Sequence, residues 1–158
     1  MTVPNSVLFV CLGNICRSPL AEAALRQEVV QARLDIIVDS AGTGDWHIGH
    51  PPDKRAQAVA RKNGIEIGAY RARQVTAGDF DRFSHVVALD VQNLSDLLAL
   101  CPAGSGASVS LLLDHVAGRE GQGVADPYYG DPRDFDIAWA DVRAGAAGLL
   151  QSLISRKT

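Results

Sequence analysis

A short apolar run near the start of the chain leads into a loop that opens with a cysteine and closes with an arginine six positions later. Val7–Val10 suit a buried strand, and the next seven residues, from Cys11 to Arg17, read Cys-Leu-Gly-Asn-Ile-Cys-Arg. Pro19 suits the first position of a helix, with Ser18 before it. The order predicts a strand, a tight loop and a helix, with the loop beside a helix N-terminus.

Such a loop favours a bound oxyanion. A helix N-terminus carries a partial positive charge and unpaired N–H groups, and successive loop amides can point at one tetrahedral anion. Gly13 permits the tight path, and Arg17 offers a planar pair of donors for two phosphoryl oxygens. The same positive field favours the thiolate of Cys11, which is the reactive form of cysteine. We therefore predict a phosphate-binding loop that contains a nucleophile.

Strand-like runs alternate with helical stretches along the rest of the chain. The runs are Val7–Val10, Asp35–Val38, His85–Leu89 and Ser108–Leu112. This alternation is typical of a parallel sheet covered on both faces. We predict an α/β fold of three layers, α/β/α, with a central four-stranded parallel sheet and the phosphate loop between the first strand and the first helix.

Three longer helices are expected. The first runs from Pro19 to about Ala32, the second lies between Pro52 and Asn63, and the last runs from Phe135 to about Ser155. The apolar positions of the last helix that we expect in the core are Ile137, Ala138, Val142, Leu149, Leu150 and Leu153.

Length and composition favour one soluble domain. A chain of 158 residues with 47% hydrophobic content suits a single domain over 1–158. No run approaches the ~18 apolar residues of a membrane span, and the first residues lack the basic head of a signal peptide, so we expect a cytoplasmic protein without membrane insertion. Three cysteines, an odd number, favour reduced thiols, and a net charge of -3 gives no footprint for nucleic acid.

Together these motifs resemble those of the low-molecular-weight protein tyrosine phosphatases, over nearly the whole chain. The matching segments are Val10–Pro19, Asp39–Gly42 with Asp45-Trp46, Arg71–Gln74, Asp90 with Asn93, and Asp126–Gly130, which reads Asp-Pro-Tyr-Tyr-Gly. The resemblance implies a metal-independent protein-tyrosine-phosphatase without a cofactor. Its expected partners are phosphotyrosine proteins, including a tyrosine autokinase, and phosphate or other oxyanions in the loop.

The resemblance also assigns catalytic roles. Cys11 would attack phosphorus to give a cysteinyl-phosphate, and Arg17 would bind the phosphate and stabilise the equatorial oxygens. Asp126 would protonate the leaving phenolate and then act as base on the attacking water. Asp-Pro by itself is an ordinary turn opener, so this last assignment depends on the resemblance.

Further residues are expected to bind the substrate or to support the loop. Trp46, Tyr128 and Tyr129 suit aromatic walls around a phenyl phosphate. In the family, the residues that match Asn14 and Ser18 hold the loop and donate to the thiolate, and Ser40 matches a residue that orients the loop asparagine. The complete set of expected substrate-binding residues is Leu12, Gly13, Asn14, Ile15, Cys16, Ser18, Trp46, Tyr128 and Tyr129.

Two residues raise questions of regulation and loop support. Cys16 follows Cys11 at a spacing that fits neither a redox turn nor a zinc knuckle, so no metal site is expected. In the family this cysteine can form a reversible disulfide with the nucleophile; simple packing in the loop is the alternative. Many relatives carry a histidine where this chain has Tyr70, whose hydroxyl could donate a hydrogen bond instead.

Two other functions compete. An arsenate reductase on the same scaffold needs a cysteine pair near the helix after the third strand, but 79–100 contains no cysteine and Cys101 stands alone. The second alternative is a phosphate-binding module without catalysis. The joint presence of Cys11, Arg17 and Asp126 argues against it.

Overall fold

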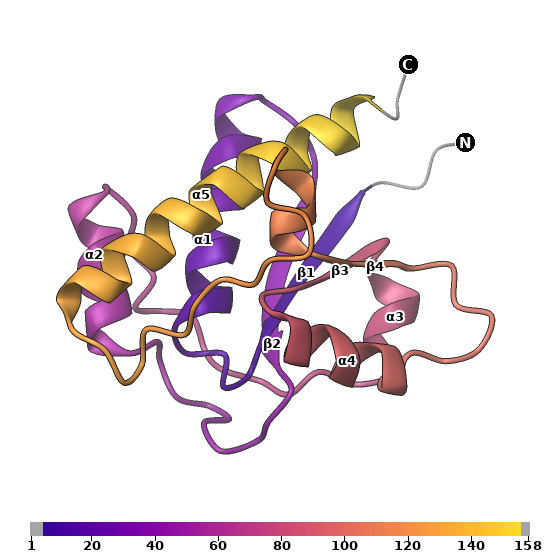
Figure 1. The fold of residues 1–158 in the computed structure, drawn as a ribbon, viewed down its shortest axis with the longest axis horizontal. Coiled ribbons are helices and arrows are strands. Elements are labelled where there is room, and N and C mark those ends of the chain that lie inside the picture. Colours follow the sequence, from indigo (N-terminus) through magenta and orange to yellow (C-terminus); the bar gives the residue numbers. More distant parts are fainter. Residues whose placement is uncertain (1–4, 156–158) are drawn as a thin grey trace.

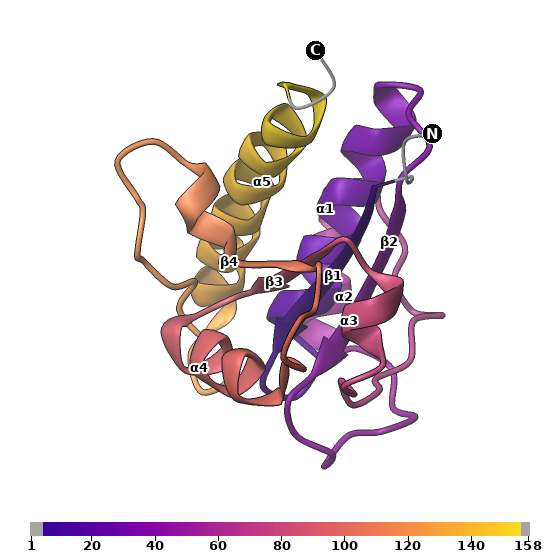
Figure 2. The ribbon, with the colours of Figure 1, turned by 90° about the vertical axis from the view of Figure 1, so that its right-hand side faces the viewer.

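The structure, a computed structural model, describes residues 5–155. Four parallel strands form one sheet in the order β2-β1-β3-β4 (Figures 1 and 2). They are β1 (Ser6–Cys11), β2 (Ile37–Gly42), β3 (His85–Ala88) and β4 (Ser108–Leu111). The predicted four-stranded parallel sheet is therefore confirmed.

Strand β1 lies in the middle of the sheet and is buried on both faces. Its side chains alternate, as in any strand: Val7 and Phe9 belong to one hydrophobic cluster, and Leu8 and Val10 belong to another. A strand covered on both faces reads as a continuous apolar run, which is how the sequence revealed it. The phosphate loop is thus anchored to the centre of the molecule.

Helices cover both faces of the sheet, as the view in Figure 2 shows. Helices α1 (Arg17–Gln31), α2 (Lys54–Lys62) and α5 (Pro132–Ser155) contribute to the larger cluster, and α5 lies alongside α1. Helices α3 (Asp79–Arg82) and α4 (Val91–Leu100) contribute to the smaller cluster on the opposite face. A short 3-10 turn, η1 (Leu112–His115), follows β4. This arrangement confirms the three-layer prediction.

The boundaries of several elements differ from the prediction. Helix α1 begins at Arg17, before Pro19, and its N-cap is Cys16, which makes no side-chain capping bond. Helix α5 begins at Pro132 rather than Phe135. The prediction that Ile137 is buried was wrong, because its side chain is 49% exposed.

Strand β2 begins and ends later in the sequence than the predicted Asp35–Val38. It pairs in register with β1 from Ile37 as far as Gly42, which lies opposite Cys11. Pairing with β1 therefore carries the polar residues Asp39 and Ser40 into the strand, and Ser40 is thereby placed beside the phosphate loop. No helix among residues 5–155 is long and apolar enough to cross a membrane.

Candidate active site

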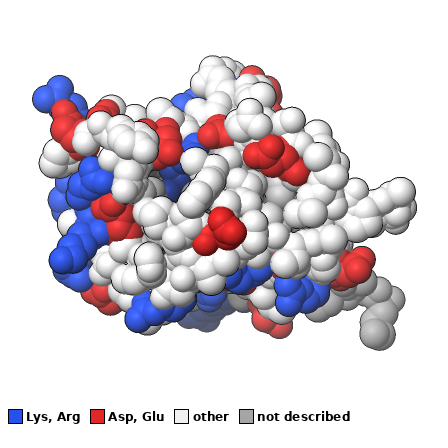
Figure 3. Space-filling model, turned by 90° about the horizontal axis from the view of Figure 1, so that it is seen from below, with Lys and Arg blue, Asp and Glu red and all other residues white. Residues whose placement is uncertain are grey.

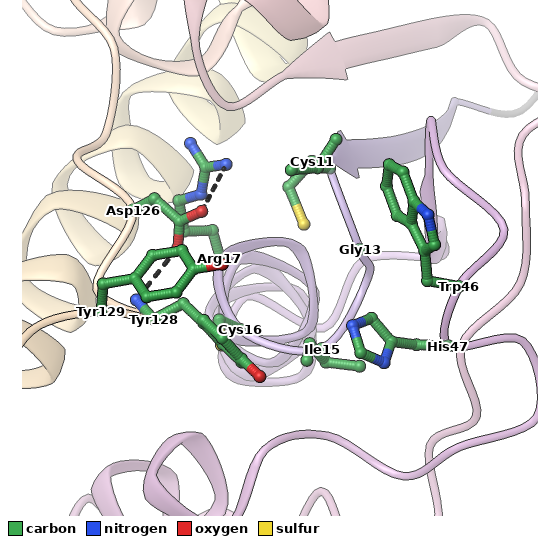
Figure 4. Close-up of a pocket in the computed structure, with 11 residues that line it drawn as sticks. Cys11, Gly13, Ile15, Cys16, Arg17, Trp46, His47, Asp126, Tyr128 and Tyr129 are labelled. Atoms are coloured by element: carbon green, nitrogen blue, oxygen red, sulfur yellow. Dashed lines mark hydrogen bonds and ion pairs between the residues drawn. The ribbon is translucent and has the colours of Figure 1, made fainter.

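A cavity of about 320 Å³ opens at the carboxyl end of β1. Its floor carries Cys11 and Arg17, while Trp46 stands on one side and Asp126 with the two tyrosines on the other (Figure 4). The lining residues are Cys11, Leu12, Gly13, Ile15, Cys16, Arg17, Trp46, His47, Asp126, Tyr128 and Tyr129. The structure therefore brings together every expected catalytic residue and every expected substrate-binding residue except Asn14 and Ser18, which are buried and do not line the cavity.

Asn14 and Ser18 connect the nucleophile to the interior. Asn14 adopts a positive φ of 58°, and its amide nitrogen donates to Ser18 Oγ at 2.8 Å and to Ser40 Oγ at 3.0 Å. Ser18 Oγ lies 3.0 Å from Cys11 Sγ. Ser18 Oγ accepts from Asn14, and its single hydrogen has two acceptors within reach, the Cys11 sulfur at 3.0 Å and the Ala41 carbonyl oxygen at 3.4 Å, of which the sulfur is nearer. The backbone N–H of Arg73 donates to Asn14 Oδ1 at 3.0 Å and holds the other side of the amide.

The network continues to a buried carboxylate on α1. Ser40 Oγ donates to Glu22 Oε1 at 2.7 Å, and Arg26 Nε donates to Glu22 Oε2 at 2.8 Å. Burial raises the pKa of Glu22, although the hydrogen bond from Ser40 and the charge of Arg26 act in the opposite direction. The Arg26 guanidinium also lies 6.0 Å from the ring centre of Tyr70. Burial, aided by Glu22, raises the pKa of Tyr70 to about 12, so its hydroxyl stays protonated.

Arg17 is a buried cation at the start of α1. Its Nη1 donates to Asp90 Oδ2 at 2.6 Å and to the Val124 carbonyl at 3.0 Å. Its Nη2 lies 3.6 Å from Asp126 Oδ2. Burial alone would lower the pKa of Arg17, but the charges of Cys11, Asp90 and Asp126 raise it above its ordinary value. The guanidinium is therefore always charged and held in place by the segments after β3 and before α5.

The aromatic rim is unevenly supported. Tyr128 and Tyr129 meet edge to face with ring centres 4.9 Å apart, and Tyr129 is 95% exposed. The Arg55 guanidinium lies 5.5 Å from the Tyr128 ring centre and 4.7 Å from that of Phe135. Asp53 holds Arg55 through two hydrogen bonds of 3.0 Å. Tyr128 is thus backed by α2 and α5, whereas Tyr129 extends into solvent.

Cys16 differs from Cys11 in its surroundings. It is buried, and burial raises the pKa of the Cys16 thiol, with the charges of Asp53 and Cys11 acting in the same direction. Cys16 is therefore a neutral thiol at neutral pH, while Ser18 and Asn14 organise the sulfur of Cys11. Within residues 5–155 no group of three or more His, Cys, Asp or Glu side chains could hold a metal ion.

A family model described as "Low molecular weight phosphotyrosine protein phosphatase" matches residues 6–158. The chain belongs to this family. The phosphatase YfkJ of Bacillus subtilis is 40% identical over 154 residues, which are 96% of this chain and 97% of YfkJ. The phosphatase of Schizosaccharomyces pombe is 41% identical over 157 residues, covering 97% and 99% of the two chains.

Solved structures agree with this assignment. The crystal structure of YfkJ superposes with a TM-score of 0.91 at 38% identity and covers 99% of each chain. A protein tyrosine phosphatase from Entamoeba histolytica, crystallised with Hepes in its active site, gives a TM-score of 0.91 at 33% identity, covering 98% of this chain and 99% of that one. This low molecular weight phosphotyrosine protein phosphatase is therefore a phosphoric monoester hydrolase with the expected α/β fold.

The sequence did not indicate all of the residues that support the lining of the phosphatase site. Glu22 belongs to none of the motifs in the sequence, but it is buried and accepts a hydrogen bond from Ser40. Arg26, four positions later on the same helix, was the available signal, because that spacing suits an ion pair. Arg55 had no motif of its own, although Asp53 two residues earlier caps α2 and binds it.

Proposed function

We propose that this phosphatase hydrolyses phosphotyrosine in proteins, and aryl phosphates generally, through a cysteinyl-phosphate on Cys11. The loop and the start of α1 supply amide dipoles, and Arg17 supplies a fixed positive charge in the same cavity. The Entamoeba relative with Hepes, a sulfonate, in its active site agrees with an oxyanion in this place.

In the first step the Cys11 thiolate attacks phosphorus in line with the departing phenol oxygen. The S–P bond forms as the P–O bond breaks, while Arg17 and the loop amides bind the equatorial oxygens. Asp126, protonated at this stage, gives its proton to the phenol oxygen. The products are a free tyrosine hydroxyl and the phosphorylated cysteine.

In the second step water attacks the phosphorus of the cysteinyl-phosphate. The Asp126 carboxylate takes a proton from this water, the S–P bond breaks, and inorganic phosphate leaves with the Cys11 thiolate restored. Since Arg17 and the helix N-terminus supply the positive charge, no metal ion takes part in this scheme. We expect EDTA to leave the rate unchanged, and a loss of activity that a divalent ion restores would contradict it.

The observation that carries the proposal is the position of Asp126, whose carboxylate lies 3.6 Å from Arg17 in the cavity that contains Cys11. We expect Asp126→Ala to slow substrates with basic leaving groups by ~10²–10⁴, the usual range for acid catalysis. Activated aryl phosphates should suffer less, so the rate should depend more steeply on the leaving-group pKa. The matched control is Asp131→Ala, an exposed neighbour whose carboxylate caps the start of α5. An unchanged slope would move the acid elsewhere.

The rim favours an aromatic substrate, because Trp46 and Tyr128 can stack on a phenyl ring. A Drosophila protein described as an arginine phosphatase has the same fold, with a TM-score of 0.87 at 33% identity. Rates on matched phosphotyrosine, phosphoserine and phosphoarginine peptides separate these activities. We expect phosphotyrosine to be fastest, and a faster rate on phosphoarginine would overturn the proposed substrate.

We also propose that the chain acts as one domain in the cytoplasm on phosphotyrosine proteins such as a tyrosine autokinase. The helices on both faces pack against one shared four-stranded sheet, which favours one domain. All three cysteines are free thiols, which suits a reducing compartment. A Cys11→Ser protein, which should bind phosphoprotein but turn over nothing, can capture the substrate for identification.

A further inference from the structure

A second depression lies directly beside the active-site cavity. It has a volume of about 400 Å³, and Leu12 and Trp46 line both hollows. We call it the side groove; the residues that carry the argument are Leu12, Trp46, Gln74, Val75, Asp96 and Leu100. Because Leu12 and Trp46 line both hollows, a substrate peptide that leaves the active site over Trp46 enters the side groove.

Trp46 lies between the two hollows and lines both of them. A Cβ atom built on Gly44 would lie only 1.9 Å from the Trp46 ring, so the indole rests on the bare backbone of Gly44. The indole is 66% exposed and lines both hollows, so one part of the ring can contact the phenyl ring of the substrate while another part contacts a second side chain. Contacts on opposite sides of the ring would span roughly 7–8 Å.

That distance matches the spacing of a peptide. An extended chain advances about 3.3 Å per residue, so two residues cover about 7 Å. A side chain one or two positions from the phosphotyrosine can therefore reach the side groove. The groove can therefore bind a side chain close to the phosphotyrosine and select among substrates by that side chain.

The chemistry of the groove points to a cation on an apolar stem. Leu12, Val75 and Leu100 provide apolar walls, and Asp96 provides a carboxylate. Within residues 5–155 this carboxylate accepts a hydrogen bond from Gln92 Nε2 at 3.1 Å and forms no ion pair. Figure 3, seen from the side on which the strands end, shows basic side chains on the left and along the lower edge, and largely uncharged surface across the middle, broken by acidic groups.

An arginine side chain satisfies each of these features. Its methylene stem can lie on the apolar walls, its planar head can stack on Trp46, and its N–H groups can donate to Asp96. We propose that the side groove is a substrate subsite for an arginine one or two residues from the phosphotyrosine. This inference rests on the proposed phosphotyrosine activity.

The test uses phosphotyrosine peptides with alanine at all other positions near the phosphotyrosine. Arginine is placed at −2, −1, +1 or +2, and each peptide is paired with one that has neutral citrulline or apolar norleucine at that position. An exposed ion pair predicts about a two- to fivefold higher kcat/KM for arginine at one of these positions, with the preference declining at high salt. Equal rates for arginine, citrulline and norleucine would overturn the inference.

Two variants assign the effect to the groove. Asp96→Asn should remove the arginine preference, while Asp45→Asn, which deletes the same charge from an exposed position outside the groove, should retain it. Both variants should hydrolyse para-nitrophenyl phosphate at the parent rate, which verifies folding. An arginine preference that survives Asp96→Asn overturns the inference. Failure of the parent enzyme on every phosphotyrosine peptide would instead overturn the proposed function.

Discussion

Asn14 links the nucleophile to the rest of the fold. Asparagine tolerates its left-handed backbone conformation better than most residues do, and its amide group bonds to Ser18, Ser40 and the backbone of Arg73. Ser40 in turn is held by Glu22. The orientation of the hydroxyl beside Cys11 therefore depends on residues that never contact a substrate.

We expect Ser40→Ala to lower kcat about tenfold while KM changes less than twofold. The substitution leaves Glu22 Oε1 without the donor from Ser40 and Asn14 without one acceptor, and a buried polar group that loses its partner costs about 1–3 kcal/mol. Ser110→Ala, on the edge strand β4, is the control and should retain the parent kcat. Steady-state kinetics on para-nitrophenyl phosphate measure both constants. A larger change in KM than in kcat would show that Ser40 acts on binding instead.

The sequence predicted the residues that line the cavity, but not all of the residues that hold them in place. Cys11, Arg17 and Asp126 occur in segments that can be recognised without a structure. Glu22 and Arg26 form an ordinary helical pair in the sequence, and burial of Glu22 depends on how α1 packs against β2. The role of Tyr70 could not be inferred either, because its ring meets Arg26 only in the folded chain.

The packing of α5 depends on two glycines that face η1. A Cβ atom on Gly148 would lie 2.0 Å from the His115 carbonyl oxygen, and one on Gly145 would lie 2.4 Å from Leu112. A backbone carbonyl cannot move aside as a flexible side chain can. The close approach of α5 to η1 thus requires glycine at these positions.

We expect Gly148→Ala to lower the free energy of unfolding by about 1–3 kcal/mol, the usual cost of overpacking. In a free helix the same change would stabilise by ~1 kcal/mol, so the sign of the effect distinguishes packing from helix propensity. The control is Ala147→Ser, an exposed position one residue earlier. Urea unfolding followed by circular dichroism measures both variants. A more stable Gly148→Ala protein would contradict the close contact.

Helices and strands with an apolar pattern of their own were predicted well. Those whose bounds depend on pairing or packing with other elements were not. The run Val7–Val10 revealed β1, and the alanine-rich segment revealed α5. The end of β2 at Gly42 follows from pairing with β1, and the four-residue helix α3 lies in a segment where no helix was predicted. Such boundaries depend on neighbours distant in the sequence.

Across the whole molecule, the buried carboxylate of Asp79 joins helix α3 to the segment before it and, through Arg73, to strand β2. Asp79 accepts hydrogen bonds from Arg73 and from the Thr76 N–H, and it forms an ion pair with Arg82. Arg73 also binds Asp39 on β2. Burial alone would raise the pKa of Asp79, but these donors lower it below its ordinary value of 3.8.

A lowered pKa means that the stability contributed by Asp79 is present above pH 3.8 and is lost as the pH falls through the folded-state value. We expect Asp79→Asn to destabilise the protein by about 3 kcal/mol or more at pH 7, as when a buried ion pair loses one partner. The difference in Tm from the parent should shrink below about pH 4. Asp81→Asn, exposed on the same helix, is the control. A difference independent of pH would contradict this ionic role.

The nucleophile and the general acid of the proposed mechanism lie in segments that differ in secondary structure. Cys11 ends the central strand, whereas Asp126 lies in 116–131, which contains no helix or strand and includes glycines at positive φ. Amide hydrogens of Val7–Val10 should therefore exchange with solvent far more slowly than those of this segment. Mild denaturant would then unfold the segment that contains Asp126 while Cys11 stays in the folded sheet. Over a narrow range of urea concentration, the parent protein would therefore show the same kinetics as the Asp126→Ala variant.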